Sequence, residues 1–333
     1  MEKYQENSEE YKILWNKQFT VKFACNAVAY GSNALPSFRL YDYKVAKSIV
    51  KLGAQTDNWL IEQIEKEGSK VIGVDTDSSF VTIKEKNLKE EGERLCKLIN
   101  ERMIDFIETY GIKKHFLKLE FDSIYKSLIF SGKRNYAGHC IWKGGKVVDK
   151  IVIKGLSAIK SDSTKLSRQI QSKILDMLLK FRAEEEIIDY LKSEIKKIFM
   201  HEYNYEMISQ PVKLEGNAEE YVYKTGDKAG TPLNLPKLRG VRWSNKFLNT
   251  NFTGGTKFYM LWCKHPNDII CFDYEERLKD VNLILDLEKM IEINIFQKLD
   301  TIFEVSNKKH ILNKLRLETK NILLGQSSLM RFI

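Results

Sequence analysis

Residues 71–83, VIGVDTDSSFVTI, place two aspartates between two apolar runs. Short apolar runs that flank a polar segment predict a β-hairpin. Strand alternation would bring Asp75 and Asp77 to the same face, where like charges repel unless a cation is bound. The stretch therefore predicts either a solvated polar turn or a pair of carboxylates that bind a metal ion.

The chemistry of the pair favours Mg²⁺ if a metal is bound. Mg²⁺ prefers oxygen ligands and is usually held by one or two carboxylates together with substrate phosphates. An isolated Asp-x-Asp pattern is more often a solvated turn. The wholly apolar run that enters DTDS is uncommon in a surface turn, however, and favours the metal-binding interpretation.

Composition limits the class of protein. The 333 residues allow two or three domains, and the 54 Lys and Arg against 45 Asp and Glu give a net charge of +9. A basic excess indicates a polyanionic partner, either nucleic acid or an anionic membrane surface. No apolar stretch approaches the roughly 20 residues of a membrane span, and the polar N-terminal segment does not resemble a signal peptide.

The cysteines and histidines are scattered through the sequence. The five cysteines form no CxxC pair, which predicts free thiols in a reducing compartment and argues against a zinc site. Together with the missing signal peptide, this predicts a cytoplasmic protein, in the host cytoplasm if a phage encodes it.

Glycines and apolar spacing predict the elements of the first half. We expect helices over 8–31, 40–67 and 88–110, each ended by a glycine, with the hairpin between the second and the third. A strand-rich block with two short turns should follow over 114–160.

The second half is predicted to be mainly helical. A helix should begin with Asp162 or Ser163 as N-cap, and a second helix should occupy 183–203. Residues 204–275 predict irregular structure with short strands, and 282–304 predict a long helix. The apolar stripe of the first of these helices consists of Leu166, Ile170, Ile174 and Leu178.

DTDS between apolar strands resembles motif C of the family B DNA polymerases, commonly YGDTDS. The family also has a fingers helix of the form Lys-x3-Asn-Ser-x-Tyr-Gly, and KFACNAVAYG supplies Lys22, Asn26 and Tyr30. The resemblance implies that these three residues bind the incoming nucleotide, with Lys22 and Asn26 on one helix face. Ala27 replaces the serine, and one extra residue precedes Tyr30, which a one-residue helical bulge would accommodate.

Two further segments resemble family landmarks in the expected order. GKRNYAG is similar to the family's KKRYAG element, and KGLSAIKSDS is similar to its entry into the thumb, after which basic residues continue along a helix. The resemblance implies contacts of these residues with the primer–template backbone. A solvated helix face is the alternative for Lys165 and Lys173. The implied DNA-binding residues are Lys133, Arg134, Tyr136, Lys154, Lys160, Lys165 and Arg168.

The resemblance implies an α+β fold with the end of the fingers helix, an antiparallel-sheet palm that carries the DTD hairpin, and a mainly helical thumb. The implied boundaries are 1–34 for the end of the fingers, 35–157 for the palm, 158–325 for the thumb and 326–333 for a clamp-binding tail.

The implied activity is DNA-directed DNA polymerisation, in which two Mg²⁺ ions assist transfer of a nucleotide from a dNTP to the primer 3′-OH. Asp77 is the main expected metal ligand and Asp75 an accessory one. The family's second aspartate comes from motif A, DxxSLYPS, and no such motif precedes Lys22. We therefore expect a separate N-terminal polymerase and exonuclease chain to supply it, as in a split polymerase of T-even-like phages; a truncated polypeptide is the alternative.

The last residues, QSSLMRFI, resemble the peptide by which replication proteins bind a sliding clamp. Its implied anchors are Gln326, Leu329, Phe332 and Ile333. A frayed tail or a last strand packed on its own domain is the alternative. For the whole chain, the alternative function is a non-catalytic subunit that binds DNA and tethers the clamp; the intact DTDS, Lys22 and Asn26 argue against it.

Overall fold

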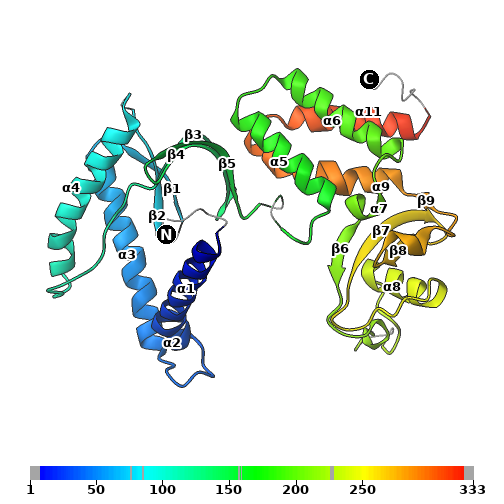
Figure 1. The fold of residues 1–333 in the computed structure, drawn as a ribbon, viewed down its shortest axis with the longest axis horizontal. Helices are drawn as coiled ribbons and strands as arrows, with labels where there is room; N and C mark the ends of the chain where they lie inside the picture. Colours follow the sequence, from blue (N-terminus) through cyan, green and yellow to red (C-terminus); the bar gives the residue numbers. More distant parts are fainter. Residues whose placement is uncertain are drawn as a thin grey trace. The chain divides into compact units, whose positions relative to one another are not determined.

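The computed structural model describes residues 8–325 except 76, 85, 157, 159 and 226–228. Helices and antiparallel sheets share this part of the chain (Figure 1), which confirms the predicted α+β class. The chain packs as two compact units, Met1–Phe121 and Asp122–Ile333. This division falls inside the predicted palm, and the functional boundaries expected at 34 and 157 stay predictions.

The first unit combines long helices with one two-stranded antiparallel sheet. Its elements are α1 (Glu9–Asn26), a π-helical turn (Ala27–Gly31), α2 (Ser32–Ala34), α3 (Tyr43–Lys66), β1 (Lys70–Asp75), β2 (Ser78–Thr82) and α4 (Leu88–Glu108).

Local side-chain chemistry sets the ends of α3 and α4. The Asp42 carboxylate accepts hydrogen bonds from the first backbone N–H groups of α3, and the Asn87 side chain accepts one at the start of α4. Gly68 and Gly111 follow the two helices with φ of +82° and +72°, a backbone region that favours glycine. The predicted glycine stops of these two helices are confirmed.

The core of the first unit lies between α3 and α4. Its buried residues are Leu60, Ile64, Ile99, Met103 and Ile107. Val71 and Val81, an opposed pair of β1 and β2, pack against this cluster and so attach the hairpin to the two helices. The Trp59 and Phe106 rings stack at 4.7 Å beside it. The DTD hairpin therefore stands on a packed helical layer.

The second unit contains two antiparallel sheets and a group of helices. The first sheet has the order β3 (Ser123–Gly132), β4 (Asn135–Lys143), β5 (Lys146–Lys154). In the second sheet, β7 (Lys257–His265) pairs with β6 (Gln210–Lys213), β8 (Ile269–Phe272) and β9 (Ile284–Leu285). The helices are α5 (Lys165–Leu179), α6 (Glu184–Phe199), α7 (Tyr205–Ile208), α8 (Pro236–Phe247), α9 (Leu287–Ile291), α10 (Gln297–Val305) and α11 (Lys309–Leu323).

Helix α5 lies in the main core of the second unit. All four residues of its predicted apolar stripe are buried, so the stripe is confirmed. The predicted N-caps Asp162 and Ser163 are wrong, because Thr164 has the extended backbone of a cap and its hydroxyl accepts the Ser167 N–H at 3.0 Å. The Thr164 hydroxyl also donates to Asn294 at 2.6 Å, which ties the start of α5 to the π-helical turn before α10.

Two helix predictions need correction, and a further helix forms where none was predicted. The first helix does not stop at Gly31, which has helical φ and ψ and continues into α2. The helix expected over 282–304 begins only at Leu287, because Asp286 caps it and β9 precedes it. The basic stretch after residue 306 forms α11, whose residues Ile311, Leu312 and Leu315 are buried.

Two segments differ in type from the predictions. Residues 114–122 form no strand, because Leu119 exchanges two 2.8 Å hydrogen bonds with the Asn100 side chain of α4. Phe121 packs against Gly92 of the same helix, where a Cβ atom would lie 2.3 Å from the ring. The segment thus runs over a helix and forms no sheet pairing there.

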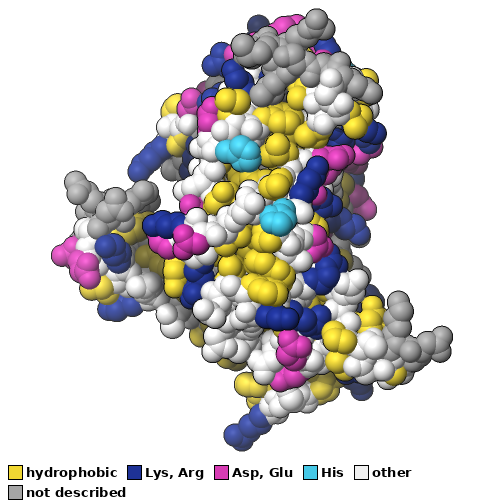
Figure 2. Space-filling model, turned by 90° about the vertical axis from the view of Figure 1, so that its right-hand side faces the viewer, with side chains coloured by type: hydrophobic (Ala, Val, Ile, Leu, Met, Phe, Trp, Pro, Cys, Tyr) yellow, Lys and Arg dark blue, Asp and Glu magenta, His cyan; other side chains and the backbone are white. Residues whose placement is uncertain are grey.

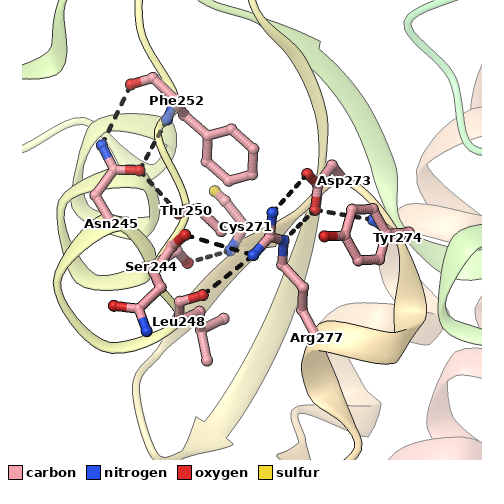
Figure 3. Close-up of polar contacts among 10 residues, drawn as sticks. Ser244, Asn245, Leu248, Thr250, Phe252, Cys271, Asp273, Tyr274 and Arg277 are labelled. Atoms are coloured by element: carbon pink, nitrogen blue, oxygen red, sulfur yellow. Dashed lines mark hydrogen bonds and ion pairs between the residues drawn. The ribbon is translucent and has the colours of Figure 1, made fainter.

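Helix α8 forms where we expected irregular structure, and polar contacts fix it to β8 (Figure 3). The Ser244 hydroxyl accepts the Cys271 N–H at 2.8 Å, and Asn245 accepts the Phe252 N–H at 3.0 Å. Arg277 forms a two-pronged ion pair with Asp273 and donates to carbonyl groups at the end of α8. The Ser244 bond joins the helix to β8, and the Asn245 bond joins it to the segment that follows the helix.

Within the described part of the chain, no helix combines the length and the apolar character that a membrane crossing requires.

Candidate active site and nucleic-acid interface

The DTD hairpin closes with a tight turn. β1 ends at Asp75, which is opposite Ser78, and the Asp77 N–H donates to the Asp75 carbonyl at 2.7 Å. The Ser78 hydroxyl donates to the same carbonyl at 3.1 Å. Asp77 is exposed and Asp75 half-buried. We expected strand alternation to bring Asp75 and Asp77 to one face of the hairpin. That argument does not apply, because β1 ends at Asp75 and Asp77 lies in the turn.

A third carboxylate, which the sequence analysis missed, lies near this turn. Asp57 of α3 is half-buried, and burial raises its pKa, with a smaller increase from the negative charge of Asp77. Helix α3, which carries Asp57, packs against the hairpin through Leu60 and Ile64. The spacing in the sequence could have indicated this burial of Asp57. Asp57 is three residues before the buried Leu60 and thus on the apolar face of α3.

The donor chemistry of the turn fits Mg²⁺. Asp75 and Asp77 carry carboxylate oxygens, the type of ligand that Mg²⁺ prefers, and Asp77 is exposed. Across the described ranges, no cluster of three or more acidic, histidine or cysteine side chains could hold a metal by itself. Asp75 and Asp77 as ligands of Mg²⁺ therefore stay a prediction.

The nucleotide-binding residues predicted on the first helix are all exposed. Lys22 and Asn26 lie in the last turns of α1, and Tyr30 lies in the π-helical turn with 45% of its surface exposed. The Ser32 N–H donates to the Ala27 carbonyl, the i to i+5 pattern of a π turn. The predicted bulge is confirmed.

The π turn affects the direction of Tyr30. An extra residue in a regular α-helix would turn all that follows by about 100°, since each residue advances the helix by that angle. A π turn absorbs the extra residue locally. Tyr30 consequently keeps nearly the orientation relative to Lys22 that the family spacing without the insertion would give it.

Helix α1 carries an exposed aromatic row. None of its residues is buried. The Trp15 and Phe19 rings stack at 5.3 Å and the Phe19 and Phe23 rings at 6.5 Å, each side chain about half or more exposed. Exposed apolar surface of this kind is typical of a face that another polypeptide segment covers.

The basic turn between β3 and β4 is the first part of the predicted DNA interface. Lys133 and Arg134 form the turn and are exposed, and Arg134 has a φ of +60°. Gly155, just after β5, approaches this turn so closely that a Cβ atom would lie 2.3 Å from the Arg134 carbonyl oxygen and 2.2 Å from the Asn135 side chain. The structure thus brings Gly155, which follows β5, close to the KRNYAG turn.

Tyr136 lies beneath this turn. It is opposite Phe130 on β3 and Lys154 on β5. Its ring lies 5.9 Å from the Phe130 ring and 5.6 Å from the Lys154 ammonium group, and only 3% of its surface is exposed. In this arrangement Tyr136 supports the turn and positions Lys154; a direct contact of Tyr136 with DNA stays a prediction.

The three remaining predicted DNA contacts differ in their surroundings. Lys160 is exposed, and Arg168 is half-buried on α5. Lys165 forms an ion pair with Glu206 at 2.8 Å, and its ammonium group lies 5.5 Å from the Tyr259 ring. The hydrogen bond to Glu206 raises the pKa of Lys165, so the ammonium group stays charged, and the Glu206 carboxylate offsets that charge. The sequence did not signal this pairing of residues 165 and 206.

On the face of the molecule in Figure 2, Lys and Arg side chains are scattered among apolar and acidic ones. The basic excess of the chain therefore does not gather into one patch on that face. The predicted clamp-binding residues 326–333 lie outside the described residues.

The chain combines a mixed helical and antiparallel architecture with a DTD hairpin on a helical layer. The family description "DNA polymerase family B" matches residues 1–230. The chain belongs to DNA polymerase family B, a family of nucleotidyltransferases.

Curated relatives agree with this membership. "DNA polymerase 2" of Aeropyrum pernix is 30% identical over 199 residues, 60% of this chain and 22% of the relative. "DNA polymerase 1" of Pyrococcus abyssi is 27% identical over 196 residues, 58% of this chain and 23% of the relative. The chain thus spans about a quarter of the length of these relatives.

The family B DNA polymerase structure from Pyrobaculum calidifontis matches 91% of this chain and 35% of that chain, with a TM-score of 0.60 and 21% identity. This likeness supports the fold.

Proposed function

We propose that this chain is the C-terminal palm and thumb part of a replicative DNA-directed DNA polymerase. The observation that carries the proposal is the exposed Asp77 on the tight DTD turn of a chain that belongs to the family. Primer–template DNA and a dNTP are the substrates, and transfer of the nucleotide to the primer 3′-OH is the reaction.

The residues of this chain take distinct roles in the proposal. Asp77, with Asp75 beside it, holds Mg²⁺, which when bound supplies Lewis-acid assistance to phosphoryl transfer. Lys22 and Asn26 bind the triphosphate through charge-assisted hydrogen bonds, and Tyr30 contacts the incoming nucleotide. Basic side chains of the second unit, among them Lys133 and Arg134, neutralise backbone phosphates of the primer–template.

The proposal includes a second polypeptide that completes the site. A two-metal mechanism needs carboxylates from two places, and the chain carries DTDS without a DxxSLYPS motif. The exposed row of Trp15, Phe19 and Phe23 supports a partner segment on α1. A split polymerase of a T-even-like phage has this organisation, with motif A and the exonuclease on the N-terminal chain; the thumb segments PKLRGVRWSNKFL and GTKFYMLW resemble those polymerases.

Primer extension tests this organisation. The purified chain with Mg²⁺, dNTPs and a primed template is expected to extend no primer, because the site lacks its second carboxylate. Addition of a chain that carries motif A is expected to restore extension. Extension by the isolated chain would contradict the split organisation, and no extension by the mixture would contradict the polymerase function.

The clamp-binding proposal for Gln326, Leu329, Phe332 and Ile333 has its own test. We expect deletion of 326–333 to abolish the increase in product length that a sliding clamp gives, because a short apolar anchor is lost. Synthesis without the clamp should be unchanged, which provides the internal control. Equal clamp stimulation of the truncated and full-length chains would refute the assignment.

A further inference from the structure

Helix α5 ends with a backbone turn that usually contains glycine. The Phe181 N–H donates to the Leu178 carbonyl at 3.1 Å, and the Arg182 N–H donates to the Met177 carbonyl at 2.9 Å. These two bonds form a Schellman turn, in which the residue after the last helical position has a left-handed backbone. At the end of α5 this residue is Phe181, with a φ of +55°.

The same turn ends α6 and α10, where its central residues are His201 and Asn307, each with a φ of +55°. Asparagine and histidine are the kinds of residue that adopt this backbone more readily, whereas a bulky apolar residue there is an outlier. Backbone strain of this kind persists where the surrounding structure holds it, and it occurs mainly at functional sites. The strain at Phe181 therefore indicates that its ring has a role.

The ring of Phe181 is 74% exposed, so packing inside the second unit does not explain the strain. A second apolar side chain, Val147 of β5, is 87% exposed. Asp149 follows Val147 by two residues and so lies on the same face of the strand. One of its carboxylate oxygens lies 3.7 Å from the ammonium group of Lys180, the residue before Phe181. The ion pair thus connects the two exposed apolar positions.

The base of the Phe181 ring is fixed to the sheet. The Ser127 hydroxyl of β3 donates to the Leu179 carbonyl at 2.6 Å, and Lys180 reaches Asp149 of β5. These contacts hold the two residues that precede Phe181. An aromatic side chain on a fixed base loses little freedom when a partner binds, and such side chains contribute most of the binding energy in many interfaces.

The charges around the ring favour a polypeptide as the partner. The cations Lys180 and Arg182 lie within 4 Å of three carboxylates, those of Asp149, Asp176 and Glu186. A surface with this balance of charge does not attract the phosphates of nucleic acid. Apolar anchors that charged groups of both signs surround are typical of protein–protein interfaces.

We propose that Phe181 and Val147 anchor the interface with the polypeptide that carries the remaining part of the polymerase. The inference rests on the proposed function, which assigns motif A to a second chain. This chain spans about a quarter of the length of its curated relatives, so a large part of a family polymerase is left to bind it. The strained backbone at Phe181 then serves to present the ring to that polypeptide.

Phe181→Gly is expected to change stability and binding in opposite directions. Glycine relieves the left-handed backbone, so the Tm of the full-length chain should rise by about 2–4 °C, despite the greater freedom of glycine in the unfolded chain. Loss of the ring should weaken binding of the motif A chain at least about tenfold, as is typical of an aromatic anchor. Scanning calorimetry measures the first effect, and isothermal titration calorimetry measures the second.

His201→Gly is the matched control, because it relieves the same backbone conformation at the end of α6 and removes an exposed side chain. It should raise the Tm by a similar amount and leave the affinity for the motif A chain unchanged. Val147→Thr keeps the branched shape that suits a strand but replaces a methyl group by a hydroxyl. It should weaken binding severalfold at an unchanged Tm.

Equal affinities of Phe181→Gly and His201→Gly for the motif A chain would overturn the inference. A loss of duplex affinity in Phe181→Gly with unchanged binding of the motif A chain would also overturn it, because the ring would then contact nucleic acid. Fluorescence anisotropy with a short DNA duplex makes this comparison.

Primer extension by the mixed chains separates the inference from the proposed function. If Phe181→Gly binds the motif A chain like wild type and the mixture extends primers, the inference fails and the proposed function stands. If binding depends on the Phe181 ring but the wild-type mixture extends no primer, the proposed function fails and the interface stands.

Discussion

Replacement of Asp77 by alanine is expected to lower primer extension by the completed enzyme at least about 10³-fold, since metal coordination contributes several kcal/mol and each 1.36 kcal/mol is tenfold in rate. The exposed position of Asp77 on the turn leaves its oxygens accessible to Mg²⁺. Single-turnover extension with wild-type chain, variant and the same motif A partner measures the effect.

The matched control is Asp105→Ala, which removes an exposed aspartate of α4 in the same unit. It should retain wild-type activity. Duplex binding of the Asp77 variant, measured by anisotropy, should stay close to that of wild type because the proposed DNA contacts lie on other elements. An Asp77 variant as active as wild type would favour the non-catalytic, clamp-tethering alternative.

The second large effect is expected from Gly155→Ala. Gly155 has a φ of +70°, and a Cβ atom there would lie 2.3 Å from the backbone carbonyl oxygen of Arg134. The left-handed backbone costs about 1–2 kcal/mol for an alanine. Overpacking typically costs a further 1–3 kcal/mol, and backbone atoms cannot simply rotate away. We expect a fall in Tm of roughly 5–15 °C, given about 2–4 °C per kcal/mol for a domain of this size.

Gly145→Ala separates the two causes. Gly145 has a φ of +87° in the turn between β4 and β5, and nothing lies within 4 Å of the Cβ position. This variant should show the backbone cost alone. Gly155→Ala should also weaken duplex binding, because the turn that carries Lys133 and Arg134 must shift. Equal losses of Tm and of DNA affinity in both variants would show that the close approach is unimportant.

The elements that the sequence predicted well have their determinants nearby. α3 and α4 combine apolar spacing with a side-chain cap and a glycine stop, and all of these lie within the helix or next to it. The hairpin likewise follows from two apolar runs and a short turn. In α5, the apolar stripe fixed the buried face, whereas the N-cap is Thr164, which also donates a hydrogen bond to the distant Asn294.

The elements that were predicted wrongly depend on contacts with residues far away in the sequence. Residues 114–122 read as a strand because their pattern alternates, yet Asn100 of α4 takes the hydrogen bonds of Leu119. α8 has few apolar residues, and its attachment depends on a hydrogen bond from Cys271 to Ser244. The position of Asp57 near Asp77 required the packing of α3 beside the hairpin. Each of these contacts joins residues far apart in the sequence.

The π turn at Ala27–Gly31 also bears on how such helices change over time. Because the turn takes up an added residue within a few positions, Lys22 and Asn26 on one side and Tyr30 on the other need not keep a fixed count between them. One added residue at this point therefore leaves the helix on either side of the turn in place. A sequence pattern with fixed spacing would therefore miss family members of this kind. A pattern that joins Lys-x3-Asn to Tyr-Gly by a gap of variable length would find them.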